Sequence, residues 1–172
     1  MTILTQPRCQ QQQRGAVIRT LQRTLLGSVV LAERGTERVV IKRSKKKGIK
    51  DRAQVLESIA VEAEVYMSLD EGHGRGKNRV MHVLDSYEDD EHVCLVLPWC
   101  SRGDLLDNCS RKGGLDQSTA LALFTQLVEG IEFLHANHVV HRDLSPENIF
   151  ITDEGAAHCH TGYRTHTNTH TL

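Results

Sequence analysis

The stretch VVHRDLSPENIF, Val139 to Phe150, constrains the fold of this chain more than any other feature. It sets polar and charged residues between two short apolar ends, and Asp143 stands five positions before Asn148. That spacing lets a tight loop present both side chains to one cleft. Directly before the loop, five apolar residues recur at helical spacing after two possible caps, Asp116 and Ser118. The five are Leu121, Phe124, Val128, Ile131 and Leu134. We therefore expect a long amphipathic helix that leads into an exposed polar loop.

The first half of the chain has the pattern of strands around one helix. Residues 25–33 and 37–44 are rich in β-branched side chains and are joined by RGTE, which predicts a hairpin. Residues 53–69 show helical spacing, and residues 79–89 and 91–99 have the pattern of two further strands. Strands first and helices later predict an α+β fold.

Composition excludes some classes of protein but identifies none. The chain has 172 residues, 39% hydrophobic and 25% charged, which indicates one globular domain. The net charge of −1 argues against a general polyanion binder, although Lys42 to Arg52 is locally basic. We interpret that run as a solvated loop, with a nuclear signal or a nucleic-acid contact as the alternative. The five cysteines form no C-x-x-C pair, which favours reduced thiols.

Targeting signals are not expected in this sequence. Residues 1–15 lack the apolar core of a secretory signal, and no run approaches the ~20 apolar residues that span a membrane. We expect an intracellular protein, cytoplasmic or nuclear, with a flexible lead-in over residues 1–20.

Three motifs in order resemble the eukaryotic protein kinases of the serine/threonine type. They are VVIK at residues 39–42, a helix glutamate about twenty residues on, and HRDLSPEN at residues 141–148. The resemblance covers roughly Leu21 to Gly155. It implies a complete small β-rich lobe over residues 21–97, then a hinge and the first part of a helical large lobe over 98–155. It gives no counterpart for residues 156–172, which we expect to be a disordered, unrelated tail.

The resemblance assigns nucleotide-binding residues in the small lobe. Lys42 would pair with the phosphates of ATP and with a helix glutamate, for which Glu62 is preferred over Glu64. Gly27 and Val29 would end the glycine-rich lid over the phosphates. The first two lid glycines are replaced by Gln22 and Thr24, so we expect a weaker grip on phosphate.

In the segment joining the lobes, the resemblance makes Leu97 the residue that controls access behind the adenine. The backbone of Pro98 and Cys100 would meet the adenine edge, and Asp104 would reach the ribose. Trp99 is interpreted as a packing residue.

In the loop, the resemblance makes Asp143 the group that accepts or orients the substrate hydroxyl proton, and Asn148 a ligand of Mg²⁺. His141 and Arg142 would support the loop. Ser145 replaces a lysine near the transferred phosphate. Loss of one such donor typically lowers the rate on the order of 10²–10³-fold, although a hydroxyl still offers a neutral hydrogen bond.

The Asp-Phe-Gly motif of the family is expected near residues 161–163, where this chain has Thr161, Gly162 and Tyr163. Glu154 is the last acidic residue of the sequence, so no later carboxylate can bridge Mg²⁺ to ATP. We therefore expect an ATP-dependent protein kinase present as a truncated, inactive fragment, with protein substrates and no membrane partner. The alternative is a non-catalytic, pseudokinase-like interaction module. Weaker alternatives are a basic nucleic-acid-binding fragment and a His/Cys metal site in the tail.

Overall fold

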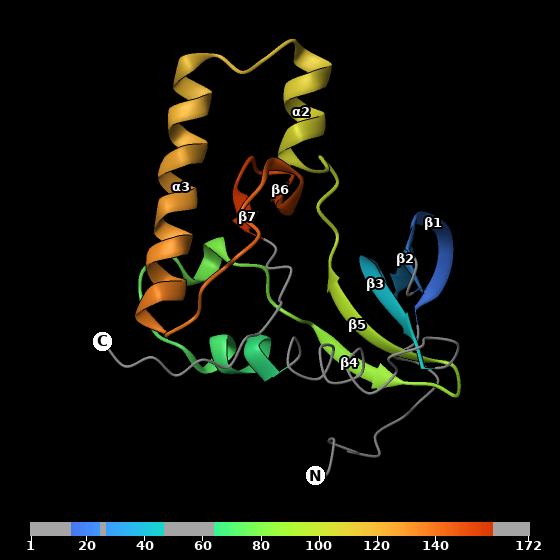
Figure 1. The fold of residues 1–172 in the computed structure, drawn as a ribbon. Helices are drawn as coiled ribbons and strands as arrows, with labels where there is room; N and C mark the ends of the chain where they lie inside the picture. Colours follow the sequence, from blue (N-terminus) through green and yellow to red (C-terminus); the bar gives the residue numbers. More distant parts are fainter. Residues whose placement is uncertain (1–14, 25–26, 47–63, 160–172) are drawn as a thin grey trace.

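The computed structural model describes residues 15–24, 27–46 and 64–159. A five-stranded antiparallel sheet lies on one side, and two helices with a small hairpin lie on the other (Figure 1). The sheet has the order β1-β2-β3-β5-β4. Its strands are β1 (Ala16–Thr24), β2 (Gly27–Arg34), β3 (Glu37–Lys45), β4 (Asp85–Glu88) and β5 (His92–Pro98). The chain passes from β5 into the helical part, so the strand end at Pro98 begins the connection between the two parts.

The helical part consists of α2 (Leu105–Lys112), α3 (Gln117–Ala136), the 3₁₀ turn η2 (Pro146–Asn148) and the hairpin β6 (Ile149–Ile151) and β7 (Ala157–Cys159). Asp116 caps α3, because its Oδ1 accepts a hydrogen bond from the Thr119 backbone N–H at 2.9 Å. Hydrogen bonds from Ser118 and Thr119 hold the pKa of Asp116 well below its usual value. The cap predicted at Asp116 is confirmed, and Ser118 supports it by donating its hydroxyl to the same carboxylate.

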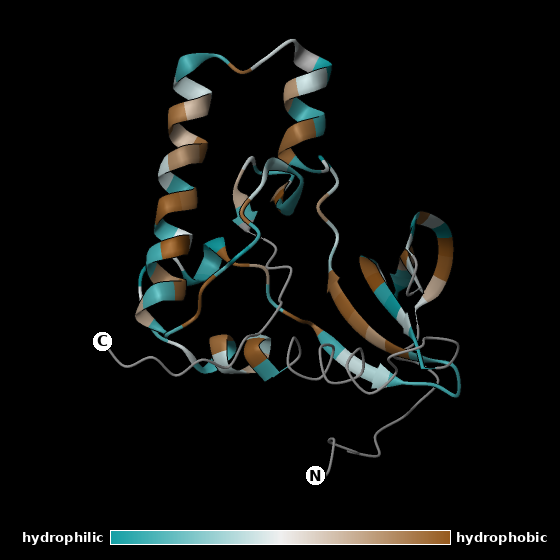
Figure 2. Ribbon diagram, in the orientation of Figure 1, coloured by the Kyte–Doolittle hydropathy of each residue, from teal (hydrophilic) through white to brown (hydrophobic). Residues whose placement is uncertain are grey.

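The register of the sheet sorts its side chains into two faces. Residues paired directly across antiparallel strands share a face. Val30, Ala32, Val39, Ile41, Cys94 and Val96 pack together on one face and are almost fully buried. The opposite face carries the residues one position along each strand, and the site described below is built on it. Figure 2 shows β5 as an almost continuously hydrophobic strand beside the hydrophilic β4, which is an edge strand of the sheet.

A second core connects the sheet to the helices. Tyr66 and Leu69 of the helical residues 64–71 pack with Leu97 of β5 and with Phe133 and Leu134 of α3. All five side chains are at most 4% exposed. Since these residues come from three distant segments, this core fixes the sheet against the long helix.

Several expectations from the sequence need correction. Residues 16–20 belong to β1 and are not part of a flexible lead-in, and the 156–172 segment contributes strand β7. The strand predicted over residues 79–89 is wrong in its first half, because the 3₁₀ turn η1 (Lys77–Arg79) and irregular residues precede β4. The strands predicted around VVIK and the α+β class are confirmed. Of the predicted helix at 53–69, residues 53–63 lie outside the described residues.

In the part of the chain that the structure describes, no helix is long and apolar enough to cross a membrane.

Candidate functional site

Three predicted nucleotide residues share one face of the sheet. Val29 pairs with Lys42 across β2 and β3, and Lys42 pairs with Leu95 across β3 and β5. Leu97 lies two residues beyond Leu95 and therefore points to the same side. Lys42 is half-buried on this face. Its predicted partner Glu62 lies outside the described residues, so the ion pair stays a prediction.

Glu64, the second choice for that pair, is exposed. This agrees with the interpretation that Glu64 lies on a solvated helix face.

Gly27 has a structural role that the sequence did not indicate. A Cβ atom at this position would lie 1.9 Å from the carbonyl oxygen of Arg43 on the neighbouring strand. Only glycine allows strands β2 and β3 to approach this closely here. The predicted role beside phosphate stays a prediction, but the residue is already required by the sheet.

Leu97 is buried at the inner end of the hinge, in contact with the core that joins the two parts of the molecule. The Cys100 carbonyl accepts the Gly103 N–H at 3.1 Å, which forms a turn directly after the predicted adenine-binding backbone. Burial, together with the nearby Asp153 carboxylate, raises the pKa of the Cys100 thiol from 9.0 to about 11. The thiol is therefore protonated and unreactive at neutral pH.

Asp104 is placed as the N-cap of α2. Its Oδ1 accepts a hydrogen bond from the Asp107 backbone N–H at 2.7 Å. The carboxylate therefore anchors the helix at the edge of the site. The expected contact with the ribose stays a prediction and would have to use the remaining acceptor capacity of this carboxylate.

The loop that is predicted to be catalytic brings Asp143 and Asn148 together. The Asn148 side-chain amide donates to the Asp143 backbone carbonyl at 2.8 Å and to Asp143 Oδ2 at 2.9 Å. The loop is supported from inside by His141, which is 5% exposed and whose carbonyl accepts the Asp143 N–H at 2.8 Å. Arg142 adopts φ 62°, a left-handed conformation that is uncommon without glycine. Such backbone conformations concentrate at functional loops.

Ser145 is half-buried and precedes the 3₁₀ turn η2. Its backbone carbonyl accepts the Asn148 N–H at 3.0 Å, so it closes the turn that carries Asn148. Ser145 thus lies between the two residues of the pair. The predicted role of its hydroxyl near the transferred phosphate stays a prediction.

The pair offers oxygen donors of the kind that Mg²⁺ prefers, a carboxylate and an amide carbonyl. The amide nitrogen of Asn148 is turned to Asp143, so the geometry orients that side chain for its oxygen to serve as a ligand. The residues present therefore fit an ion that keeps several waters. Within the described ranges, no three His, Cys, Asp or Glu side chains gather into a metal-binding group.

Asn108 was not predicted from the sequence, yet it fixes the base of the site. This buried side chain donates 2.7 Å hydrogen bonds to the carbonyls of Arg102 and Asp104. The Gly103 carbonyl in turn accepts the Ile151 N–H of β6 at 2.9 Å. Hydrogen bonds thereby join the segment after β5 to α2 and to strand β6, which directly follows the loop of Asp143 and Asn148. The only signal in the sequence is an amide in a short amphipathic helix, which does not identify its partners.

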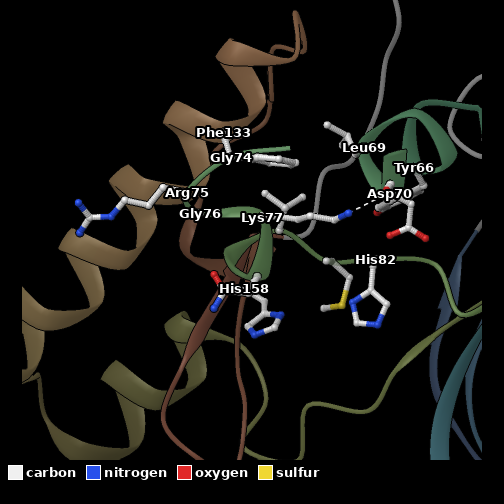
Figure 3. Close-up of a pocket in the computed structure, with 13 residues that line it drawn as sticks. Tyr66, Leu69, Asp70, Gly74, Arg75, Gly76, Lys77, His82, Phe133 and His158 are labelled. Carbon is white, nitrogen blue, oxygen red and sulfur yellow. Dashed lines mark hydrogen bonds between the residues drawn. The ribbon is translucent and has the colours of Figure 1, made fainter. Parts of the chain in front are cut away.

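A pocket of about 540 Å³ lies apart from these residues, between the helical residues 64–71, residues 74–82 and α3. Figure 3 shows Phe133, Leu69 and His158 on its wall, with Arg75 directed away from it. None of Lys42, Asp143 and Asn148 lines this pocket.

A lysine-bearing sheet face, a buried hinge and a loop that joins an aspartate to an asparagine define a protein-kinase-like fold. Sequence comparisons agree: the family description "Protein kinase domain" matches residues 23–160. The chain belongs to this family and, within it, to the serine/threonine kinases. The family match continues beyond Gly155 and corrects the expectation that the resemblance ends there.

Curated relatives carry the same family name. NUAK family SNF1-like kinase 2 of Homo sapiens is 34% identical over 139 residues, which are 80% of this chain and 21% of that protein. The human liver/testis phosphorylase b kinase gamma catalytic chain is 37% identical over 78 residues, 45% of this chain and 19% of that protein. A probable myosin light chain kinase of Dictyostelium discoideum is 40% identical over 74 residues, 43% of this chain and 15% of that protein. The chain thus spans about a fifth of the length of these relatives.

Proposed function

We propose that this chain carries part of the active site of an ATP-dependent kinase that phosphorylates serine or threonine in proteins. The observation that carries the proposal is the hydrogen-bonded pair of Asp143 and Asn148 in a loop held by the buried His141. Lys42, on the sheet face that it shares with Val29 and Leu95, supplies the cation expected beside the phosphates of ATP.

In this mechanism each residue has one task. Asp143 accepts the proton of the substrate hydroxyl as the hydroxyl oxygen bonds to the γ-phosphorus, while the bond from that phosphorus to the β,γ-bridging oxygen breaks and ADP leaves. Asn148 orients the Asp143 carboxylate through its amide N–H groups and offers its oxygen to Mg²⁺. Lys42 holds the α and β phosphates in an extended conformation. When bound, Mg²⁺ neutralises charge that develops on the phosphates. Ser145 donates a neutral hydrogen bond where the family has an ammonium group, which supports a reduced rate.

The 172-residue chain is proposed to be inactive by itself. The support is chemical: the family uses an Asp-Phe-Gly carboxylate as a metal ligand, and this sequence has Thr161, Gly162 and Tyr163 at those positions. A second function, a non-catalytic module that binds nucleotide or a protein partner, is favoured by the same substitution. The net charge of −1 supports protein partners over nucleic acid, and an intracellular location is part of the proposal because ATP is the co-substrate.

Thermal melting of the 172-residue chain with ATP, with and without Mg²⁺, tests the proposed nucleotide site, and a phosphate-transfer assay tests the proposed inactivity. We expect ATP to raise the melting temperature and Lys42→Met to abolish the rise, while transfer of labelled phosphate to casein stays undetectable. Exposed Lys45, also on β3, gives the matched control Lys45→Met, which should behave as wild type. Failure of ATP to stabilise the wild-type chain would refute the proposed nucleotide site, and measurable phosphate transfer would refute the proposed inactivity.

In a version of the chain extended to a complete kinase domain, Ser145→Lys should raise the rate of phosphate transfer because it restores a cation near the transferred phosphate. An unchanged rate would show that another residue already fills this role.

A further inference from the structure

Glu129, in the middle of α3, binds two arginines of the loop that follows the helical residues 64–71. Its Oε1 accepts a hydrogen bond from Arg75 at 2.7 Å and its Oε2 accepts one from Arg79 at 3.3 Å. The Glu129 side chain is only 18% exposed, and that of Arg79 only 24%, whereas Arg75 is 83% exposed. One partly buried carboxylate therefore serves two cations more than 45 residues away in the sequence.

The backbone confirms that the loop is built to lie against α3 at this point. A Cβ atom at Gly76 would lie 2.0 Å from the Glu129 carbonyl oxygen, and Gly76 has φ 88°. On the helix side, a Cβ atom at Gly130 would meet Arg79 at 3.2 Å. Glycine inside a helix normally costs stability. Its presence at position 130 is explained by the close approach of the loop.

The same loop is attached to the end of the helical residues 64–71. The Lys77 ammonium donates to the Asp70 backbone carbonyl, as the dashed line in Figure 3 shows. A cation at this position also interacts favourably with the carbonyl end of a helix. Beyond the helix, a Cβ atom at Gly72 would lie 2.7 Å from the Asn137 side-chain oxygen at the end of α3. The end of the helical residues 64–71 is thus bonded to the loop that Glu129 holds, and the chain directly after it lies close to the end of α3.

From α3 the connection continues to the catalytic loop. The Leu134 carbonyl accepts the Val139 N–H at 2.9 Å, and His141 follows two residues later. Phe133 and Leu134 also pack with Tyr66 and Leu69 in the core that joins the two parts of the molecule. Polar contacts at Glu129 and apolar contacts at Phe133 therefore fix the same two helices.

We propose that Glu129 is a positioning residue: by holding Arg75 and Arg79, it fixes the helical residues 64–71 relative to α3 and the catalytic loop. The proposal rests on the proposed function, in which the loop carries Asp143, and on the prediction that Glu62, two residues before this segment, pairs with Lys42. Glu129 touches no substrate. It acts by fixing the position of the helical residues 64–71 relative to the loop that carries Asp143.

Amide hydrogen exchange of the full 172-residue chain tests the positioning directly. In Glu129→Gln we expect exchange at residues 64–71 to rise about fivefold, because two charge-assisted contacts are lost. Strands β2 and β3 should be unchanged. Glu132→Gln is the matched control, since Glu132 is an exposed carboxylate on the same helix. Unchanged exchange at 64–71, or an equal rise over the whole chain, would overturn the proposal.

Two further variants separate positioning from general stability. Arg79→Met should reproduce part of the effect of Glu129→Gln, because it removes one of the two contacts of this carboxylate. Adding Arg79→Met to Glu129→Gln should change little, because the contact that it breaks is already lost. Glu129→Asp keeps the charge and should restore part of the protection. Fully additive effects of the two substitutions would contradict a shared contact.

ATP-induced melting shifts of the same proteins keep the two proposals apart. We expect the shift to shrink in Glu129→Gln and to stay at the wild-type value in Glu132→Gln. If the wild-type chain shows no shift, the proposed nucleotide site fails, while the exchange data still decide whether Glu129 positions the helix. A wild-type shift that Glu129→Gln leaves unchanged would overturn the link from Glu129 to the site.

Discussion

Alanine substitutions at three glycines measure how much the close contact between residues 74–79 and α3 contributes to the free energy of unfolding. Gly113 has φ 67° with nothing within 4 Å of an added Cβ atom, so Gly113→Ala adds only backbone strain. At Gly27, whose φ is not positive, an added Cβ atom would lie 1.9 Å from a backbone oxygen, so Gly27→Ala adds only overpacking. Gly76 combines φ 88° with a 2.0 Å contact to the Glu129 carbonyl. The three substitutions are otherwise the same.

The expected magnitudes follow from these geometries. A left-handed conformation costs an alanine about 1–2 kcal/mol, which sets the loss of unfolding free energy in Gly113→Ala. Overpacking against a backbone that must shift costs about 1–3 kcal/mol, which sets the loss in Gly27→Ala. Gly76→Ala should lose the sum, about 2–5 kcal/mol, from a total that is ~5–15 kcal/mol in typical domains.

Urea unfolding followed by circular dichroism measures all three variants on one scale. We expect the midpoint to fall in the order wild type, Gly113→Ala, Gly76→Ala, with little change in the slope. Amide exchange should place the loss in Gly76→Ala at residues 64–81 and the loss in Gly27→Ala in the sheet. If Gly76→Ala is no less stable than Gly113→Ala, the loop does not lie against α3 as described, and the inference drawn for Glu129 loses its support.

Four further outcomes are expected. Cys100 should resist alkylation at neutral pH, because burial raises the pKa of its thiol from 9.0 to about 11. The unfolding free energy should fall by about 2–3 kcal/mol as the pH rises between these two values, since the thiol of the unfolded chain ionises first. Cys100→Ala should remove this decline. Asn148→Ala removes both side-chain bonds to the loop aspartate and should eliminate the Mg²⁺-dependent part of the ATP-induced melting shift. Phe124→Ser replaces a side chain that is 61% exposed, so it should reduce aggregation in light scattering and change stability by less than ~0.5 kcal/mol. Hydrogen bonding from Arg75 lowers the pKa of Glu129 below its usual value of 4.5, so its contribution is fully present above that pH. The protection factors of residues 64–71, which correct for the slower intrinsic exchange in acid, should therefore fall as the pH falls through the range below 4.5.

The strands that the sequence predicted are those whose own side chains decide their structure. In β3 the buried Val39 and Ile41 alternate with more exposed residues, the pattern of a strand with one face in a core. In β1 every residue except Leu21 is exposed, so its sequence carries no burial pattern, and the strand exists because β2 offers it an edge. Strand β7, with the sequence Ala-His-Cys, is too short to show a pattern of its own, and it forms as the partner of β6 with Ala157 buried.

In the candidate site, too, the sequence predicts the contacts between nearby residues and misses those that depend on distant ones. The five-residue spacing of Asp143 and Asn148 is local, and the structure brings these two side chains into contact as predicted. Asp104 was assigned a ligand contact, whereas its local geometry gives it a helix cap. Glu129 could not have been identified from the sequence, because its arginine partners lie 50 and 54 residues away and only the folded core brings them together.

The two halves of the site are assembled by one packing event. The sheet alone can bury the face that carries Val39 and Ile41, but it cannot bury Leu97, whose neighbours Phe133 and Leu134 come from α3. The helix alone leaves Phe133 without Tyr66 and Leu69, so the catalytic loop that follows it has no fixed base. Contacts over such sequence separations form late and cooperatively, because loop-closure entropy is lost before they are gained. We therefore expect the lysine on the sheet and the aspartate in the loop to be brought together only when the core around Leu97 closes. A change that loosens this core should disturb both parts of the candidate site even where it touches neither.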